Sequence, residues 1–274
     1  MTTKTKTPIN KIINCDNRVG LRSLPSDSIP LTVTSPPWDD VRVYGDGIST
    51  AWNQDVFQEV ADELWRVTAP GGIVCWHVGE QIRNGSESGT SSEQRLYFRD
   101  IGFRLWQTML IETMAGHTHG TRYGSSIQYV FVLSKGKPNS VNLLRDRPNK
   151  HAGEVKGFNK RRSDGSFFTT RQTVIAEYGL RGCVWRYHPR RQEDEEAQTH
   201  PAPMHEKLAR DLIVSFSNPG NVVLDVFSGA GTVPKHAMLN GRHYLGFEAV
   251  KNYCQLSKRR LERYRTTIES PSPV

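Results

Sequence analysis

Hydrophobic and polar positions along the chain form two kinds of pattern, short apolar β-branched runs and longer amphipathic stretches. The apolar runs predict buried strands at residues 9–14, 29–34, 73–78, 106–112, 127–133, 222–226 and 243–247. Apolar residues at helical spacing predict helices at residues 53–68, 93–101, 204–216 and 250–264, and a further helix ending at residue 240. Strands that alternate with helices predict an α/β fold.

The strand at residues 29–34 ends in Ser35-Pro36-Pro37-Trp38. Consecutive prolines stop a strand and stiffen its exit, and they carry no N–H. The motif therefore offers a hydroxyl, rigid carbonyls and an aromatic face at a strand's carboxyl end, where open α/β sheets bind ligands. A planar ring with an amino group could stack on Trp38 and donate to Ser35 and to the carbonyls. A strand-ending turn with a core tryptophan explains this motif alone equally well.

A second motif follows the strand at residues 222–226. Asp225 is followed by a turn containing Gly229 and Gly231, and Glu248 ends the next predicted strand. Glycines permit a tight turn and close backbone approach, and an acidic residue about 20 positions later can accept hydrogen bonds from ribose hydroxyls. Together with the Ser-Pro-Pro-Trp edge, this spacing favours a nucleoside-cofactor site over a purely structural turn.

The two motifs resemble motif IV and motif I of the amino-methylating DNA methyltransferases, which use S-adenosylmethionine. Ser35 resembles the cytosine-N4-specific members, and the order of the motifs along the chain resembles the circularly permuted β group. The resemblance implies a permuted Rossmann-like methyltransferase sheet, methyl transfer to the N4 amino group of a flipped-out cytosine, and no required metal. An adenine-N6 DNA methyltransferase of the same fold and a non-catalytic DNA-binding protein are the alternatives.

The resemblance also implies the residues of the site. The catalytic residues would be Ser35, Pro36, Pro37 and Trp38. The cofactor would be bound by Asp16, Thr34, His200, Pro201, Asp225, Phe227, Ser228, Gly229, Gly231, Thr232 and Glu248. For Asp16, a helix N-cap is an equally good interpretation.

The positive charge of the chain is concentrated in one segment. The whole chain has a net charge of +8, and residues 135–191 contain 14 Lys/Arg against four Asp/Glu, interleaved with aromatic residues. This composition is typical of a DNA-contacting insert, although a disordered basic linker is the alternative. We expect the aromatics to provide some packing. The predicted DNA contacts are Arg42, Tyr44, Lys160, Arg161, Arg162, Arg171, Arg181 and Arg186, although Arg42 and Tyr44 could equally lie in a solvated loop.

These interpretations predict three parts. Residues 1–135 would form the catalytic part of the methyltransferase domain, residues 136–198 a basic target-recognition insert, and residues 199–274 the part that binds S-adenosylmethionine. Double-stranded DNA is the expected partner, with a cognate restriction endonuclease as a further candidate.

Several features predict a cytoplasmic protein. The sequence contains no run of 18 apolar residues, so it predicts no membrane span. The polar N-terminus lacks the apolar core of a signal peptide. The four cysteines are far apart and form no metal or disulfide pattern. By resemblance we expect a prokaryotic or phage-encoded protein associated with the nucleoid. The pair His117 and His119 has no third ligand nearby and does not predict a metal site.

Overall fold

The computed structural model describes residues 7–38, 52–113, 121–157, 159–170, 172–187 and 194–269. The chain divides into two compact units. Met1–Asn142 and Cys183–Val274 form the first, called here the sheet unit. Leu143–Gly182 form the second, called here the ribbon unit. The expected parts at residues 1–135, 136–198 and 199–274 stay a prediction.

The sheet unit contains an eight-stranded sheet in the order β1-β16-β15-β2-β3-β7-β6-β14. The first five strands in this order run parallel to their neighbours. Strand β7 is antiparallel to both β3 and β6, and β14 is parallel to β6. The strands are β1 (Lys11–Asn14), β2 (Ile29–Thr34), β3 (Thr68–Val78), β6 (Arg104–Glu112), β7 (Ile127–Ser134), β14 (Val184–Arg186), β15 (Val222–Asp225) and β16 (His243–Glu248).

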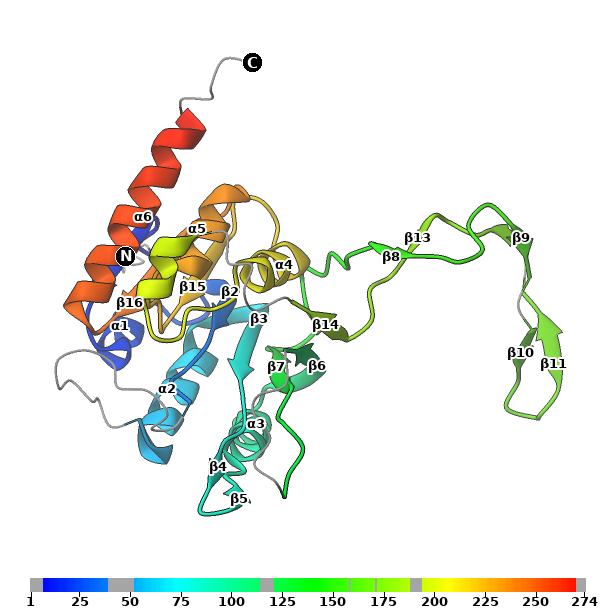
Figure 1. Ribbon diagram of the computed structural model, residues 1–274, viewed down its shortest axis with the longest axis horizontal. Helices are drawn as coiled ribbons and strands as arrows, with labels where there is room; N and C mark the ends of the chain where they lie inside the picture. Colours follow the sequence, from blue (N-terminus) through cyan, green and yellow to red (C-terminus); the bar gives the residue numbers. More distant parts are fainter. Residues whose placement is uncertain are drawn as a thin grey trace, which may run out of the picture. The chain divides into compact units, whose positions relative to one another are not determined.

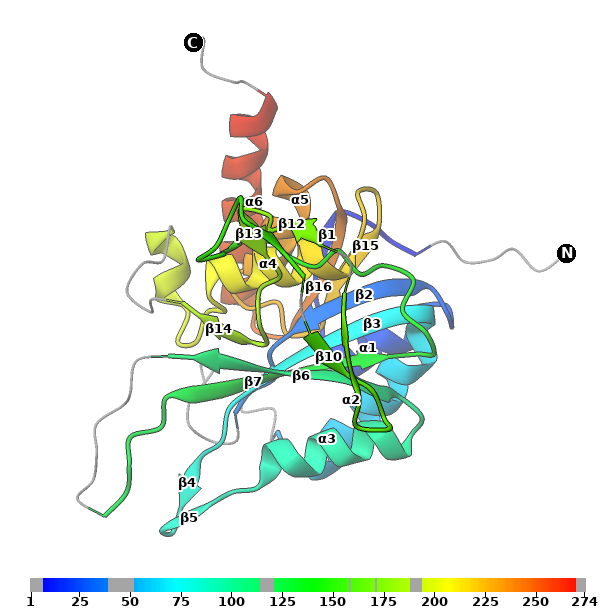
Figure 2. The same cartoon turned by 90° about the vertical axis from the view of Figure 1, so that its right-hand side faces the viewer.

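Helices cover both faces of this sheet (Figures 1 and 2). One face carries α1 (Asn17–Arg22), α2 (Gln54–Val67) and α3 (Thr90–Asp100), and the other carries α4 (Glu206–Phe216), α5 (Thr232–Leu239) and α6 (Lys251–Glu269). A short 3-10 helix η1 (Glu195–Thr199) precedes α4, and a small hairpin pairs β4 (Ile82–Arg83) with β5 (Ser86–Glu87). Because helices cover both faces, the central strands read as nearly continuous apolar runs.

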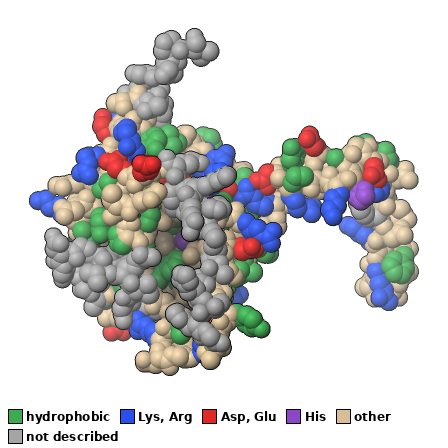
Figure 3. Space-filling view, in the orientation of Figure 1, with side chains coloured by type: hydrophobic (Ala, Val, Ile, Leu, Met, Phe, Trp, Pro, Cys, Tyr) green, Lys and Arg blue, Asp and Glu red, His purple; other side chains and the backbone are tan. Residues whose placement is uncertain are grey.

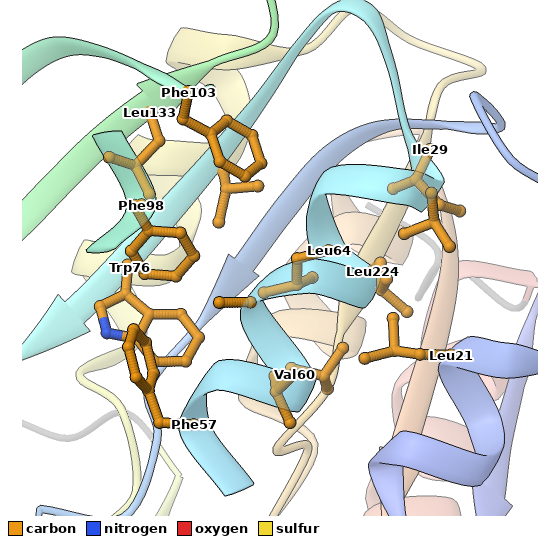
Figure 4. Close-up of a cluster of buried hydrophobic side chains, with 14 of the residues drawn as sticks. Leu21, Ile29, Phe57, Val60, Leu64, Trp76, Phe98, Phe103, Leu133 and Leu224 are labelled. Atoms are coloured by element: carbon orange, nitrogen blue, oxygen red, sulfur yellow. The ribbon is translucent and has the colours of Figure 1, made fainter. Parts of the chain in front are cut away.

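The core between α2 and the sheet is rich in aromatic residues (Figure 4). Phe57 of α2 and Phe98 of α3 pack against Trp76 of β3, with ring centroids 5.9 and 5.1 Å from it. The Trp76 Nε1–H donates to Gln94 Oε1 at 2.8 Å, so the buried indole keeps a polar partner. Each such buried side chain contributes on the order of 1.5–3 kcal/mol to folding. This packing fixes α2 and α3 beneath the strands that carry the site.

The order of connections reverses in the middle of the sheet. Helix α2 leads from β2 to β3 on one side, whereas α5 leads from β15 to β16 on the other. The reversal lies between β15 and β2, where Leu224 is paired with Thr32. In open α/β sheets, ligands bind beyond the carboxyl ends of the strands at such a reversal. This point therefore locates the candidate site.

The largest differences from the predicted boundaries are at the start of β3 and the end of α6. The strand predicted at residues 73–78 begins earlier, at Thr68, and so includes Pro70-Gly71-Gly72. The Gly71 N–H donates to the Lys135 carbonyl at 2.6 Å and the Lys135 N–H donates to the Gly72 carbonyl at 3.1 Å, so this segment is paired although it contains a proline. Helix α6 continues to Glu269, past the expected end at residue 264.

The ribbon unit is a long antiparallel ribbon made of nested strand pairs. Its pairs are β8 (Arg147–Pro148) with β13 (Tyr178–Gly179), β9 (Val155–Lys156) with β12 (Thr173–Val174), and β10 (Asn159–Arg161) with β11 (Phe167–Thr169). The Arg162 N–H closes the end turn by donating to the Ser166 carbonyl at 2.7 Å. Lys and Arg side chains are spread along this unit (Figure 3).

The aromatic residues of residues 135–191 were expected to provide some packing. Trp185 of β14 is buried in the sheet unit, but Phe167, Phe168 and Tyr178 of the ribbon unit are exposed. No described residue of this unit is buried, and the side chain of Phe167 is 68% exposed. The guanidinium carbons of Arg161 and Arg162 instead lie 5.9 and 5.0 Å from the ring centroids of Phe167 and Phe168. A two-stranded ribbon with no core of its own leaves both faces available. Within the described residues of the chain, no helix has the length and apolarity needed to cross a membrane.

Candidate functional site

The two sequence motifs meet at the carboxyl edge of the parallel strands. Ser35-Pro36-Pro37-Trp38 follows β2, the glycine turn follows β15, and Glu248 is the last residue of β16. Since β16, β15 and β2 are adjacent and parallel, their carboxyl ends lie at one edge of the sheet. Residues that are about 190 positions apart in sequence, such as Thr34 and Asp225, are therefore brought into contact.

A buried hydrogen bond joins the two motifs. The Thr34 hydroxyl donates to Asp225 Oδ1 at 2.7 Å, and the Phe227 N–H donates to the same oxygen at 3.1 Å. Burial raises the pKa of Asp225 to about 7, with the nearby charge of Glu248 adding to the rise, although the two hydrogen bonds act to lower it. The carboxyl group of Asp225 consequently changes its charge near neutral pH.

The glycine turn has the backbone that its sequence predicts. Gly229 and Gly231 have φ values of +49° and +77°, in the left-handed region that other residues avoid. Glu248 supports the turn because its Oε2 accepts a hydrogen bond from the Gly229 N–H at 2.7 Å. Its Oε1 accepts from the Val250 N–H at 2.8 Å, and burial raises the pKa of this carboxyl group.

His200 and the hydroxyl residues also lie around the turn. A Cβ added to Gly229 would lie 2.9 Å from His200 Nε2, so only a glycine leaves room for this approach. The His200 ring packs edge-on against Tyr253, with centroids 4.5 Å apart. The buried hydroxyls of Ser228 and Thr232 have no hydrogen-bond partner among the described residues. Two carboxylates, unpaired hydroxyls and a glycine backbone form a donor and acceptor set that fits a nucleoside with an amino-acid side chain.

Residues of β3 and of the segment just after it contact Trp38 of the Ser-Pro-Pro-Trp motif and hold it in place. Pro36 is buried, and Ser35, Pro37 and Trp38 are half-buried. The Trp38 ring packs edge-on against His77, with centroids 5.5 Å apart, and a Cβ on Gly79 would lie 3.0 Å from it. The Trp38 carbonyl accepts a hydrogen bond from Gln81 Nε2. Stacking of Trp38 on a base stays a prediction.

Sequence reasoning missed two residues at this edge. Trp52 packs edge-on against Phe227, with centroids 5.1 Å apart, and extends the aromatic cluster toward the glycine turn. His77 is buried with Nε2 2.9 Å from Gln128 Oε1, and burial lowers its pKa to about 4, although the hydrogen bond with Gln128 opposes the change. His77 is thus uncharged at neutral pH. Trp52 stands alone in the sequence and His77 lies inside an apolar strand, so neither belongs to a sequence pattern that predicts a functional residue.

Asp16 adopts the N-cap geometry that was one of its two interpretations. Its Oδ1 accepts from the Arg18 N–H at 2.8 Å at the start of α1, and its Oδ2 pairs with Arg18 Nη2 at 2.9 Å. The Arg18 side-chain hydrogen bond holds the pKa of Asp16 below its usual range, although burial acts against it. A contact of Asp16 with a cofactor, and likewise one of Pro201, stays a prediction.

The predicted DNA contacts fall into three groups. Lys160, Arg161 and Arg162 lie on β10 and the turn after it and are exposed. Arg181 pairs with Asp146 within the ribbon unit, and Arg186 Nε lies 2.7 Å from Glu112 Oε2 in the sheet unit, so both charges already have a partner. Arg42, Tyr44 and Arg171 lie outside the described residues, as do His117 and His119. Within the described ranges, no group of three or more potential metal ligands occurs.

Comparison with known proteins decides the family. A family model described as DNA methylase, covering N6- and N4-methylating enzymes, matches residues 29–259. The chain belongs to this DNA methylase family. The methylase is 43% identical over 244 residues to the orphan methyltransferase M.BamHII of Bacillus amyloliquefaciens, a match that covers 86% of this chain and 90% of that protein. It is 27% identical over 259 residues to the DNA adenine methyltransferase YhdJ of Escherichia coli, covering 92% and 82% of the two chains.

Solved structures show the same fold. The PvuII DNA methyltransferase, described as cytosine-N4-specific, matches the methylase with a TM-score of 0.69 at 17% identity, covering 96% of this chain and 93% of that chain. TTHA0409 of Thermus thermophilus, a putative DNA modification methylase solved with S-adenosylmethionine, matches with a TM-score of 0.62 at 23% identity, covering 92% and 93%. The expected α/β fold is confirmed, and the methylase is an S-adenosylmethionine-dependent DNA methyltransferase.

Proposed function

We propose that the methylase transfers a methyl group to the N4 amino group of a cytosine flipped out of double-stranded DNA. The observation that carries this proposal is the buried Thr34–Asp225 hydrogen bond, which joins the Ser-Pro-Pro-Trp edge to the glycine turn. It keeps the groups suited to an amino-bearing ring next to the groups suited to a nucleoside cofactor. The order of the two motifs along the chain supports a circularly permuted arrangement of the methyltransferase fold.

The cofactor would be held at the glycine turn. Asp225 and Glu248 would accept its hydroxyl and amino hydrogens, Gly229 and Gly231 would allow close backbone approach, and His200 would line one side. Phe227, with Trp52 packed on it, offers an aromatic face to a cationic group. When bound, S-adenosylmethionine supplies an activated methyl group on a positively charged sulfur.

The protein's own contribution is to position and stabilise the amino group of the base. A ring amino group is a poor nucleophile because its lone pair is delocalised into the ring. The Ser35 hydroxyl and the carbonyls of Ser35 and Pro36 would accept hydrogen bonds from its two hydrogens, favour a pyramidal nitrogen and stabilise the positive charge that develops on it. Once the new nitrogen–carbon bond has formed, one of these hydrogens would leave as a proton to solvent. His77 beneath Trp38 is neutral at physiological pH, so it adds no opposing positive charge.

Cytosine is favoured over adenine on two observations. Ser35 is the first residue of the Ser-Pro-Pro-Trp motif, and a serine at this position resembles the cytosine-N4-specific enzymes. The PvuII enzyme, described as cytosine-N4-specific, shares the fold. Adenine N6 is the second candidate because YhdJ, described as an adenine methyltransferase, is 27% identical to the methylase. The chemistry of the edge is the same for either ring, since both present an amino group bonded to an aromatic carbon.

The ribbon unit would contact the DNA. It contains nine Lys/Arg against four Asp/Glu, and its end carries Lys160, Arg161 and Arg162 beside two exposed phenylalanines. A two-stranded ribbon fits the major groove of duplex DNA, with cations contacting phosphates and base edges. We include residues 136–198 in this proposal as the target-recognition insert. A cognate restriction endonuclease stays a prediction of the resemblance.

The test is transfer of tritiated methyl groups from S-adenosylmethionine to plasmid DNA by the wild type and by Ser35→Ala. We expect Ser35→Ala to lower kcat by about 100-fold or more, the scale seen when one transition-state hydrogen bond is removed, while its affinity for S-adenosylmethionine changes less than twofold. Ser86→Ala, in the exposed β4–β5 hairpin, is the matched control and should keep the wild-type rate. A wild-type rate in Ser35→Ala would contradict the assigned role, and a wild type that labels no DNA would favour the non-catalytic alternative.

A further inference from the structure

A cluster of charged side chains is buried behind the glycine turn. Its members come from segments that are far apart in sequence: Asp194 of the η1 N-cap, Glu206 of α4, Lys235 and His236 of α5, and Arg260 of α6. Arg260 and Glu206 are both 0% exposed. Buried ion pairs add little net stability compared with well-packed apolar side chains. The role of this cluster is therefore better inferred from where its donors point than from its contribution to the stability of the fold.

Arg260 donates in three directions. Its Nε–H donates to Asp194 Oδ2 at 3.0 Å and its Nη2 to Glu206 Oε1 at 2.9 Å. Its Nη1 donates to the carbonyl of Ala230, the residue between the two glycines of the turn. Arg260 therefore contacts the backbone of the turn directly, one residue after the Gly229 N–H that donates to Glu248.

The two acidic partners of Arg260 lie on either side of residues 195–205, called here the His200 segment. Asp194 caps η1, which ends next to His200, and Glu206 begins α4 a few residues after it. Burial alone would raise the pKa of Asp194, but the charge and hydrogen bond of Arg260, the hydrogen bond of Arg263 and the charge of Lys235 bring it down to about 2. The acidic partners are ionised at neutral pH, so the guanidinium group is held by charge-assisted hydrogen bonds.

Lys235 provides a comparison within the same cluster. It is a second buried cation, with Nζ 2.5 Å from Glu206 Oε2 and 3.7 Å from Asp194 Oδ2. Its ammonium group also lies 4.5 Å from the centroid of the Tyr264 ring. These contacts of Lys235 are with side chains, whereas those of Arg260 include the carbonyl of Ala230 in the turn.

We propose that Arg260 is a positioning residue for the cofactor, setting the glycine turn at a fixed distance from the His200 segment. This inference rests on the proposed location of the S-adenosylmethionine site. The planar guanidinium fork can bond three acceptors with one rigid group, whereas the compact ammonium of a lysine cannot span the same three positions. Loss of the fork would leave the turn and the His200 segment free to separate, and the cofactor would be bound less tightly.

The test compares Arg260→Lys and Arg260→Met with the control Lys235→Met. Affinity for S-adenosylmethionine is measured by titration calorimetry, KM is measured separately for cofactor and DNA, and melting temperatures are recorded without ligand. We expect both Arg260 variants to lose cofactor affinity by about tenfold or more, the range for one charge-assisted hydrogen bond. Arg260→Lys keeps the charge but leaves some of the buried acceptors without a donor, so it should lower the melting temperature less than Arg260→Met does. Lys235→Met should lower the melting temperature as much as Arg260→Met but change cofactor affinity less than twofold, and KM for DNA should be unchanged in all three.

The proposal is overturned if Arg260→Lys binds S-adenosylmethionine as tightly as the wild type. It is equally overturned if Lys235→Met loses as much affinity as the Arg260 variants, because affinity would then follow stability alone. Failure of the proposed cofactor site itself is seen separately, since the wild type would then bind no S-adenosylmethionine.

Discussion

Thr34→Val tests the hydrogen bond that joins the two motifs, because valine keeps the shape of threonine and has a methyl group in place of the hydroxyl. That hydroxyl donates to the buried Asp225 Oδ1 at 2.7 Å. A hydrogen bond to an ionised group contributes about 1.5–3 kcal/mol, against about 0.5–1.5 kcal/mol for a neutral one. The difference, roughly 1–1.5 kcal/mol, favours the ionised carboxylate and corresponds to about one pKa unit. Thr34→Val should therefore raise the pKa of Asp225 from about 7 by about one further unit.

The direction of the pH dependence follows from this pKa. Burial raises the pKa of Asp225 above its ordinary value of 3.8, so the ligand-free protein loses stability as the pH rises from that value through about 7. Bound S-adenosylmethionine, with its positive charge and its hydroxyl donors, should favour the ionised form. Cofactor affinity should thus rise with pH across neutrality and level off above it. In Thr34→Val the same rise should occur about one unit higher.

At pH 7 the ionised fraction of Asp225 would fall from about one half to about one tenth, weakening cofactor affinity about fivefold, and pH 9 should restore it. Titration calorimetry between pH 6 and 9 measures this shift. Thr32→Val is the matched control, since Thr32 lies on the same strand and its buried hydroxyl has no hydrogen-bond partner among the described residues. A Thr34→Val profile that coincides with the wild type, or an equal shift in Thr32→Val, would refute the reasoning.

Two further predictions concern the glycine turn and the ribbon unit. Gly231→Ala combines a φ of +77° with overlap between the new Cβ and a serine hydroxyl of α6, and should lower cofactor affinity more than tenfold and stability by at least about 2 kcal/mol. Gly85→Ala, with a φ of +76° in open space, is its control and should lose only about 1–2 kcal/mol of stability with no loss of affinity. Replacing Arg161 and Arg162 together by alanine should weaken DNA binding. If each arginine contacts one phosphate, the slope of log K against log salt concentration, where K is the association constant for DNA, should become less steep by about two. Fluorescence anisotropy across KCl concentrations measures that slope. The control Arg99→Ala, on exposed α3, should leave the slope unchanged. An unaltered slope in the double variant would exclude phosphate contacts by Arg161 and Arg162.

Much of the sheet unit could be predicted because its signals are local. The strand at residues 29–34 appears with the expected limits, since an apolar β-branched run ends at two prolines. The glycine turn also follows from local sequence, because positive φ values demand glycine. The helix at residues 54–67 begins where the Asn53 side chain accepts from the Val56 N–H, a recognisable cap.

The remaining features depend on contacts between distant segments. Arg260 lies in a helix rich in charged residues and gave no sign that it would be buried against Ala230. His77 interrupts an apolar strand, and its uncharged state depends on burial rather than on neighbouring residues in sequence. The aromatic residues of residues 135–191 suggested some packing, but those that the structure describes in the ribbon unit are exposed, and Phe167 and Phe168 lie beside arginines. Composition alone does not distinguish buried aromatic side chains from exposed ones.

The most direct test of the central claim is the identity of the methylated base. DNA incubated with the wild type and isotopically labelled S-adenosylmethionine is digested to nucleosides and examined by mass spectrometry. We predict the label in N4-methylcytosine, and its absence when Ser35→Ala replaces the wild type. Label in N6-methyladenine would keep the family and the site but contradict the assignment of cytosine.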